Sequence, residues 1–379
     1  MDFALTEQQK QLQVTMRDFV AKEIIPIADE MDRLQEFPVT CFKKLAKLGI
    51  TGMGIPKEYG GTDGNLATLV VALEELARGW ASIASIIDTH VCLGARSIYR
   101  LGTEEQKRKF VVPLAQGEKQ VSFALTEAEA GSDAAALETT ATKKGDVYVL
   151  NGKKTFIMSA DVCATALVFA TIDKSLGSRG ITAFIVEKGT AGFSVGKKYD
   201  KLGMRAATTA ELLFEDCCIP AQNLLGEEGR GLRVALSTLD EGRIGMAAQA
   251  VGLAHGVLDA SVTRAKQRVQ FGRPIADQEA IQWMLADIST HLDAARLLVY
   301  KAAYLCDQGQ PFSKEAATAK LFASEAAMAA ATKGIQIHGG YGYMMDSPMQ
   351  RHFRDAKLIE IYEGTSEMQR LVISRAILA

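Results

Sequence analysis

The spacing of hydrophobic residues changes at about residue 121 and changes again at about residue 228. Outside these positions, apolar residues recur at helical spacing, as in LQVTMRDFVAKEIIPIADEMD and RVALSTLDEGRIGMAAQAVG. Between them, short alternating runs such as VYVL and ITAFIVEK are separated by turn sequences such as KGD. We therefore expect an α+β protein: a helical domain at 1–120, a central antiparallel β-domain at 121–228, and a helical domain at 229–379 with helices at about 279–308, 313–335 and 366–378.

The composition argues against several classes of function. The chain has 379 residues and a formal net charge of −2, so no basic surface for nucleic acid is indicated. Charges interrupt every apolar run before it reaches the roughly 18 residues of a membrane span. The acidic, amphipathic start MDFALTEQQKQLQ does not resemble a signal peptide. We expect a cytoplasmic protein without membrane insertion.

The cysteines and histidines form no metal-binding pattern. Six cysteines are scattered along the chain without CxxC spacing, and the five histidines form no HExxH motif. We expect reduced, buried thiols and no metal site.

Two short motifs could bind or transform a ligand, and each also has a purely structural explanation. In IYEGTSE (361–367), Glu363 is either a base beside a reactive group or a helix-end residue that faces water. The glycines of QIHGGYGY (336–343) either let the backbone approach a phosphate or form a turn between helices. No glycine-rich segment has the strand and helix context of a Rossmann fingerprint.

Two further motifs are equally open. Arg268 and Arg273 in QRVQFGRPI (267–275) suit a phosphate by their forked geometry, or they are surface arginines at a helix end. Thr126 and Ser132 in LTEAEAGSD (125–133) either donate to a polar ligand or cap a turn. Each of these signals is weak by itself.

Taken in order along essentially the whole chain, the motifs resemble the acyl-CoA dehydrogenase family, nearest to its short- and medium-chain, butyryl-CoA dehydrogenase-like branch. The motifs are LTEAEAGSD, LNGKKTFI, LGEEGRG, DEGRIGMAAQAVG, QFGRPI, QIHGGYGY and RDAKLIEIYEGTSE. The resemblance implies an FAD flavoprotein with an N-terminal α-domain, a central β-domain and a C-terminal four-helix-bundle domain. It also implies a homotetramer that passes electrons to electron-transferring flavoprotein.

The implied reaction is the α,β-dehydrogenation of an acyl-CoA thioester to the trans-2-enoyl-CoA. A Cα proton is only weakly acidic, so the site needs a positioned base and a means of stabilising the enolate. The family's base matches Glu363, with flavin N5 accepting the Cβ hydride on the other side of the substrate. The apolar residues Leu358, Ile359 and Ile361 beside Glu363 predict burial and a raised pKa of its carboxyl. A neighbouring branch places its base at the position that is Gly242 here.

The resemblance also implies the other residues of the site. Substrate contacts are expected at Ser132, Asp240, Arg243 and Gly364. FAD contacts from the β-domain are expected at Phe123, Leu125, Thr126, Ser132, Phe156, Ile157 and Met158. A neighbouring subunit is expected to contribute Arg268, Phe271, Gln336, Ile337, His338, Gly339 and Gly340, with Thr365 and Glu367 near the adenosine.

Three positions depart from the family pattern. Met158 stands where a threonine usually bonds flavin N5, and methionine cannot donate, so Ser159 or water must replace that bond or the flavin's behaviour changes. Glu279 replaces a glutamine near the FAD pyrophosphate, where an acid is unfavourable. Asp88 falls on the helix expected to line the acyl-tail end of the pocket. It either faces water or pairs with His90 or an arginine, or it meets a polar, cyclic or unusual acyl group or acts as a second acid–base group.

Other functions on the same fold stay open. An enoyl-CoA reductase would run the same chemistry in reverse, and Met158 keeps that direction open. An acyl-CoA oxidase usually carries a longer chain, and a flavin monooxygenase generally lacks the glutamate, so both are disfavoured. A catalytically silent flavoprotein subunit is disfavoured by Glu363 and Arg243. The acyl group is undetermined, and a short or compact one is favoured.

Overall fold

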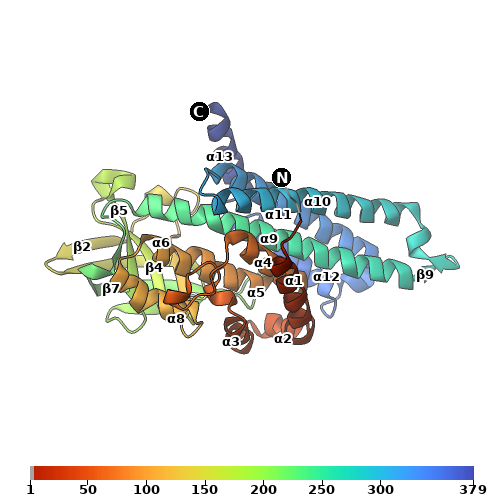
Figure 1. Ribbon diagram of the computed structural model, residues 1–379, viewed down its shortest axis with the longest axis horizontal. Helices are drawn as coiled ribbons and strands as arrows, with labels where there is room; N and C mark the ends of the chain where they lie inside the picture. Colours follow the sequence, from red (N-terminus) through yellow and green to blue (C-terminus); the bar gives the residue numbers. More distant parts are fainter. Residues whose placement is uncertain (1–3) are drawn as a thin grey trace.

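The computed structural model describes residues 4–379. Figure 1 shows a β-sheet at one end of the molecule and a small two-stranded hairpin at the opposite end, joined by long helices that run through the middle. Helices of the N-terminal part lie along one side of these long helices. The predicted α+β fold, with a sheet between two helical parts of the sequence, is confirmed.

The N-terminal part is built around α4 (Leu66–Gly79), which is buried along most of its length. Its neighbour α5 (Ala81–Asp88) is buried at every position and runs directly into a π-helical stretch, Thr89–Ala95. Such stretches interrupt the regular α-helical spacing and so change where the following side chains point. The other helices of this part are α1 (Glu7–Phe19), α2 (Ile25–Leu34), α3 (Val39–Lys47), α6 (Arg96–Leu101), α7 (Glu104–Gln106) and α8 (Val112–Ala115).

The central sheet has the strand order β6-β7-β3-β2-β4-β5-β8. Strand β4 is buried at every position and β5 at all but its last, so both are covered on both faces. The strands are β1 (Val121–Ala124), β2 (Thr140–Lys144), β3 (Val147–Met158), β4 (Thr165–Thr171), β5 (Ile181–Glu187), β6 (Phe193–Lys198), β7 (Thr209–Pro220) and β8 (Leu224–Leu225).

The sheet is mixed, which corrects the expectation of a purely antiparallel one. Most neighbouring strands are antiparallel, but β1 runs parallel to β4, with Val121 opposite Thr165, and β2 meets β4 in parallel at Thr140. The chain between β1 and β4 forms the β2–β3 hairpin and returns, which is the long crossover that a parallel pair needs. The alternating pattern has the same period in both orientations, so it could not distinguish them.

The C-terminal part contains three long helices, α9 (Gly231–Gln267), α10 (Glu279–Asp307) and α11 (Ser313–His338). The hairpin of β9 (Val269–Gln270) and β10 (Arg273–Pro274) joins α9 to α10. Two shorter helices follow, α12 (Pro348–Ile359) and α13 (Ser366–Leu378). Because α9 packs in one core with α4, the first and last helical parts are not separate bodies, and the division at residues 120 and 228 stays a prediction. Within residues 4–379, no helix has the length and apolar character needed to cross a membrane.

Candidate active site

The loop between α12 and α13 carries Glu363 in a left-handed backbone conformation, with φ of 54°, followed by Gly364 at 95°. This conformation costs a non-glycine residue about 1–2 kcal/mol. Three buried side chains hold the loop by donating to its carbonyl oxygens. Lys320 Nζ lies 2.7 Å from Gly364 O, Gln369 Nε2 lies 2.8 Å from the same oxygen, and Arg243 Nε lies 3.4 Å from Glu363 O. The surrounding helices therefore determine where the Glu363 side chain points.

The carboxyl of Glu363 is enclosed. Its Oε2 atom is buried and has no hydrogen-bond partner, although other parts of the residue reach the surface. Burial raises the pKa of this carboxyl to about 8, and the positive charges of Lys320 and Arg243 oppose that rise. Gly242 on α9 makes the space, because a Cβ at this position would overlap Glu363 Oε2 and the side chain of Leu93.

Asp88 lies against the same face of α9, one turn further along. A Cβ at Gly245 would overlap its carboxyl, just as one at Gly242 would overlap that of Glu363. Asp88 is fully buried, and among residues 4–379 no N–H or O–H group donates to its carboxyl; the weakly donating thiol of Cys92 lies beside it. His90 Nε2 is engaged with Leu114 O at 3.0 Å. The alternative that Asp88 faces water or pairs with His90 or an arginine is therefore wrong for the part of the chain that the structure describes. Burial and the nearby Glu363 raise the pKa of Asp88 well above its usual range.

Arg243 also pairs with Asp240, one turn earlier on α9. The Nη1 atom of Arg243 lies 2.6 Å from Asp240 Oδ1, and both side chains are mostly buried. Thr365 begins α13, accepting a hydrogen bond from the backbone N–H of Met368, and Glu367 lies exposed in the first turn of that helix. The expected substrate residues Asp240, Arg243 and Gly364 thus gather around Glu363, and Ser132 lies exposed on a loop of the sheet.

The expected FAD contacts of the β-domain lie on β1, on the loop after it and at the end of β3. Phe123 packs against Phe169 with ring centroids 5.0 Å apart, while Leu125 and Ile157 are buried. Phe156 is 63% exposed, has a φ of 57° and packs against Tyr199 with the two rings tilted by 37°. An exposed aromatic ring on strained backbone is typical of a ligand surface rather than of a core.

The hydroxyl missing at Met158 is not replaced by Ser159. Ser159 is fully buried and accepts a hydrogen bond from Gln120 Nε2 at 3.1 Å. The sulfur of Met158 accepts a hydrogen bond from Thr89 Oγ1 at 3.3 Å, on the helical turn directly after Asp88. The end of β3 therefore contacts the helix that carries the buried aspartate.

A buried ion pair holds the loop that carries Thr126. Lys154 Nζ on β3 lies 2.7 Å from Glu127 Oε1 and 3.0 Å from Leu125 O, and Glu127 also accepts from the backbone N–H groups of Glu138 and Thr139. Burial lowers the pKa of Lys154 to about 8, and Glu127 opposes that effect. Neither partner of this pair was among the predicted site residues.

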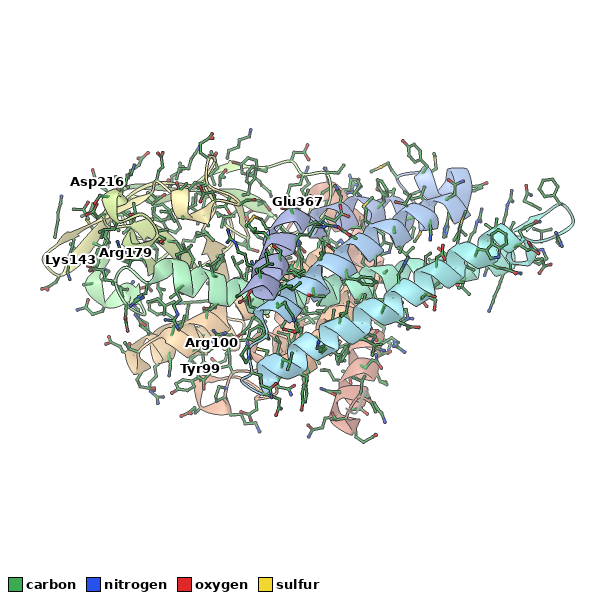
Figure 2. All side chains as sticks on the ribbon, turned by 90° about the horizontal axis from the view of Figure 1, so that it is seen from above. Tyr99, Arg100, Lys143, Arg179, Asp216 and Glu367 are labelled. Carbon is green, nitrogen blue, oxygen red and sulfur yellow. The ribbon has the colours of Figure 1, made fainter. Side chains whose placement is uncertain are left out.

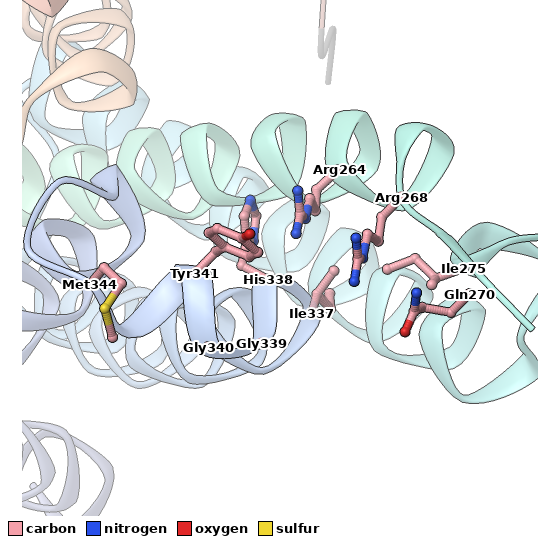
Figure 3. Close-up of a pocket in the computed structure, with 10 residues that line it drawn as sticks. All are labelled: Arg264, Arg268, Gln270, Ile275, Ile337, His338, Gly339, Gly340, Tyr341 and Met344. Atoms are coloured by element: carbon pink, nitrogen blue, oxygen red, sulfur yellow. The ribbon is translucent and has the colours of Figure 1, made fainter.

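Most of the second group of expected FAD contacts lines a pocket of about 490 Å³ near the hairpin (Figure 3), but Phe271 and Gln336 are not among its lining residues. Arg264 and Arg268 project from α9 toward Gly339 and Gly340, where an added Cβ would meet no atom within 4 Å. The buried Nε atom of Arg264 has no hydrogen-bond partner. Two guanidinium groups facing open glycine backbone suit a phosphate-containing ligand. The remaining lining residues are Gln270, Ile275, Ile337, His338, Tyr341 and Met344.

The two groups of expected FAD contacts are not brought together within one chain. The hairpin that carries Phe271 lies at the end opposite the sheet in Figure 1. In Figure 2, Glu367 lies between that hairpin and the sheet, where Lys143 is labelled. Phe271 is 96% exposed and has a φ of 52°. Glu279 is exposed at the first position of α10, where the helix dipole favours a carboxylate.

Comparison with known proteins identifies the family. Models of the acyl-CoA dehydrogenase N-terminal, middle and C-terminal domains match residues 6–118, 122–217 and 229–378. This chain belongs to the acyl-CoA dehydrogenase family. It is 48% identical to acryloyl-CoA reductase (NADH) of Anaerotignum propionicum, covering 100% of this chain and 96% of that protein.

Two solved structures superpose on the whole chain. The butyryl-CoA dehydrogenase of Megasphaera elsdenii gives a TM-score of 0.98 at 46% identity, with 100% of both chains covered. A chain from a structural study of the electron-transferring flavoprotein of Acidaminococcus fermentans gives a TM-score of 0.98 at 47% identity, again with 100% of both chains covered.

Sequence reasoning missed four residues that organise the site: Lys320, Gln369, Arg264 and Lys154. Lys320 lies in the alanine-rich helix α11, where a single lysine looks like an ordinary solvent-facing residue. Lys154 follows Lys153 on β3, and successive residues of a strand point to opposite faces. This alternation could have indicated that one of the two lysines is buried. Arg264 lies one helical turn before Arg268, and this spacing could have identified it.

Proposed function

We propose that this chain is an FAD-dependent acyl-CoA dehydrogenase acting on a short or compact acyl-CoA thioester. The Glu363 carboxyl carries the proposal: it is buried, has an oxygen without a hydrogen-bond partner, and lies on backbone held by Lys320, Gln369 and Arg243. Burial makes a carboxylate a stronger base than it is in water, as removal of a weakly acidic C–H proton requires. Family membership supplies the reaction class.

Each residue around Glu363 then has a role. Glu363 takes the Cα proton, and the cations of Lys320 and Arg243 favour its ionised form. Gly364 leaves room for the thioester because it has no side chain. FAD, the cofactor of this family, accepts the Cβ hydride when it is bound. Phe156, Met158 and the loop of Thr126, held by the Lys154–Glu127 pair, form the surface against which it binds.

A complete FAD site needs two copies of the chain. The surface at Phe156 belongs to one copy, and the arginine- and glycine-lined pocket at Arg268 belongs to a neighbour, because the two surfaces lie at opposite ends of one chain. Arg264 and Arg268 face the pyrophosphate in this arrangement. The assembly is a homotetramer, and the acyl-CoA binds beside Glu363 in each subunit.

Electrons leave to electron-transferring flavoprotein, a proposal supported by the likeness to the Acidaminococcus fermentans chain. The likeness to an acryloyl-CoA reductase favours a second candidate, the reduction of a 2-enoyl thioester with the same residues. In that direction Glu363 delivers the proton to Cα. Reoxidation of the reduced enzyme by a 2-enoyl-CoA, compared with reoxidation by electron-transferring flavoprotein, distinguishes the two directions.

The test is an anaerobic titration of the FAD holoenzyme with acyl-CoAs, following the loss of flavin absorbance. The panel holds butyryl-, octanoyl-, isobutyryl-, cyclohexanecarboxyl- and phenylpropionyl-CoA. We expect at least one to bleach the flavin in the wild-type protein, and Glu363→Gln to slow that bleaching by about 100-fold or more.

Glu360→Gln is the matched control, because Glu360 caps the end of α12 three residues earlier and its carboxylate pairs with Lys357. It should bleach at the wild-type rate. Bleaching that Glu363→Gln leaves intact would remove Glu363 as the base. A protein that binds no FAD would overturn the proposed function itself.

A further inference from the structure

Close to Glu363 lies a second buried carboxyl, that of Asp88, which the reaction described so far does not use. Asp88 is fully buried on α5, and within residues 4–379 neither of its oxygens accepts a hydrogen bond from an N–H or O–H group. The thiol of Cys92, a weak donor four residues on, is the polar group beside it. A buried, unsatisfied carboxyl costs the fold several kcal/mol, so a residue of this kind indicates a ligand that satisfies it.

The carboxyl groups of Glu363 and Asp88 lie against the same face of helix α9, one turn apart. Gly242 makes room for Glu363, and Gly245, one turn along on the same face, makes room for Asp88. Residues three apart on a helix lie about 5–6 Å apart, which is a few bond lengths along an acyl chain. Thr89, the residue after Asp88, contacts Met158 at the expected flavin surface. Asp88 thus lies between the base and the end of β3.

We propose that Asp88 is a second proton acceptor of this site, and that the enzyme takes 2-enoyl thioesters, whose acidic hydrogen lies at Cγ instead of Cα. This inference rests on the proposed function. A double bond between Cα and Cβ leaves no acidic hydrogen at Cα, and conjugation transmits the pull of the thioester carbonyl to Cγ. A base that serves such a substrate must lie apart from Glu363 along the acyl chain, and Asp88, one turn along α9 from Glu363, is the carboxyl available for this role.

The proton step balances with the groups named. The Asp88 carboxylate forms an O–H bond with the Cγ proton, the Cγ–H bond breaks, and its electron pair enters the conjugated thioester as a dienolate. The negative charge passes to the thioester oxygen. Asp88 then returns the proton to Cγ, and in D2O it returns a deuteron. Glu363 performs the corresponding exchange at Cα of a saturated thioester.

Hydrogen exchange in D2O separates the two bases. Two matched pairs are offered: pentanoyl-CoA with trans-2-pentenoyl-CoA, and cyclohexanecarboxyl-CoA with its 1-ene analogue. The saturated members are offered to anaerobically reduced holoenzyme, which cannot accept a hydride, and the 2-enoyl members to oxidised holoenzyme, which has no hydride to donate. NMR and mass spectrometry then locate and count the deuterium. Wild-type enzyme should label Cα of a saturated member and Cγ of an unsaturated one.

The variants Asp88→Asn and Glu363→Gln should change the ratio of Cγ exchange to Cα exchange in opposite directions. Asp88→Asn should lower Cγ exchange about 100-fold relative to Cα exchange, and Glu363→Gln should lower Cα exchange relative to Cγ exchange. Ser82→Ala removes a buried hydroxyl on the same helix, α5, and controls for packing. It should leave the ratio of Cγ exchange to Cα exchange unchanged.

Two results would overturn this inference. One is wild-type enzyme that labels Cα of saturated thioesters but never Cγ of unsaturated ones, a measurement that needs no variant. The other is a ratio that Asp88→Asn leaves unchanged. Failure of Cα exchange in every saturated thioester would instead contradict the proposed function, so the two failures are distinguishable.

Discussion

Glu363 can act as a base only when its carboxyl is ionised, and burial raises the pKa of that carboxyl from 4.5 to about 8. We therefore expect kcat/KM for a saturated acyl-CoA to rise about tenfold per pH unit up to about pH 8 and then to level. The measurement is the initial rate of flavin reduction as a function of pH. A profile that is flat from pH 6 to 8 would contradict a base of this pKa.

The same raised pKa affects stability in the opposite direction. Between about pH 4.5 and 8 the folded state holds a proton on Glu363 that the unfolded state has released. Stability therefore falls as pH rises through this window, because the folded state binds more protons there. Burial of Glu363 therefore makes its carboxylate a stronger base and lowers the stability of the folded state as pH rises through the same range.

Lys320 should determine the pH at which the ascending limb of the pH–rate profile lies. Its buried ammonium group donates to Gly364 O, and its charge lowers the pKa of Glu363. In Lys320→Met the pKa of Glu363 should rise, so the ascending limb of the pH–rate profile should move to higher pH. Lys301→Met, which removes a half-exposed lysine of α10, should leave the limb in place. An unmoved limb in Lys320→Met would assign Lys320 a purely structural role.

Among single residues, those that belong to family motifs could be predicted from the sequence. Residues on other helices that contact these motifs only in the folded protein were missed. The raised pKa of Glu363 was expected from its apolar neighbours, and the structure agrees with it. Lys320 and Gln369 could not be predicted, because their contact with the loop arises only when α11 and α13 pack around it. Whether Asp88 faces water likewise depends on tertiary packing, because α5 is covered on all sides by the elements that pack around it.

Among the elements, β3 offers a matched pair of lysines. Lys154 is fully buried in an ion pair with Glu127, while Lys153, one residue earlier, pairs with Glu211 at the surface. Removing one partner of a buried pair costs about 3–5 kcal/mol, and an exposed pair contributes about 0–1 kcal/mol. Lys154→Met should therefore lower unfolding stability by several kcal/mol and reduce FAD content, and Lys153→Met should do neither.

Urea unfolding and the ratio of flavin to protein absorbance make the two measurements. The double variant Lys154→Met with Glu127→Gln should recover part of the lost stability, because no unpaired charge is left buried. Equal losses in the Lys153 and Lys154 variants would show that the loop around Thr126 does not depend on this pair.

Long helices were easier to predict than short or parallel elements. The expected helices at 279–308, 313–335 and 366–378 correspond to α10, α11 and α13. Helix α12 was missed, because its polar sequence PMQRHFRDAKLI has a narrow apolar side and its stability comes from packing on α11. The parallel pairing of β1 depends on a crossover, which local spacing does not record.

For the whole molecule, the prediction to test is that the exposed tip of the β9–β10 hairpin contacts another subunit. Phe271 is 96% exposed on strained backbone, far from the sheet of its own chain. In the proposed assembly it packs at a neighbour's FAD site, so Phe271→Ala should lower FAD retention and weaken the tetramer while leaving the far-UV circular dichroism unchanged. Val14→Ala removes another exposed apolar side chain, on α1, and should have no effect.

Analytical ultracentrifugation with flavin and protein detection measures both quantities. Unchanged mass and flavin content in Phe271→Ala would count against a role of the hairpin tip between subunits. The arrangement of subunits could not follow from the sequence by local reasoning. It entered only through the family resemblance, because nothing in a hydrophobic pattern tells whether an exposed phenylalanine meets solvent or another copy.

The distance between the two half-sites of a single chain has a genetic consequence. In the proposed assembly, a chain altered at Glu363 and a chain altered at Arg268 would each be inactive alone, yet they would damage opposite halves of the composite site. Produced in one cell, they would form mixed assemblies in which some sites combine an intact Glu363 with an intact Arg268. Two defective alleles would then complement each other, as a site contained within one chain would not allow.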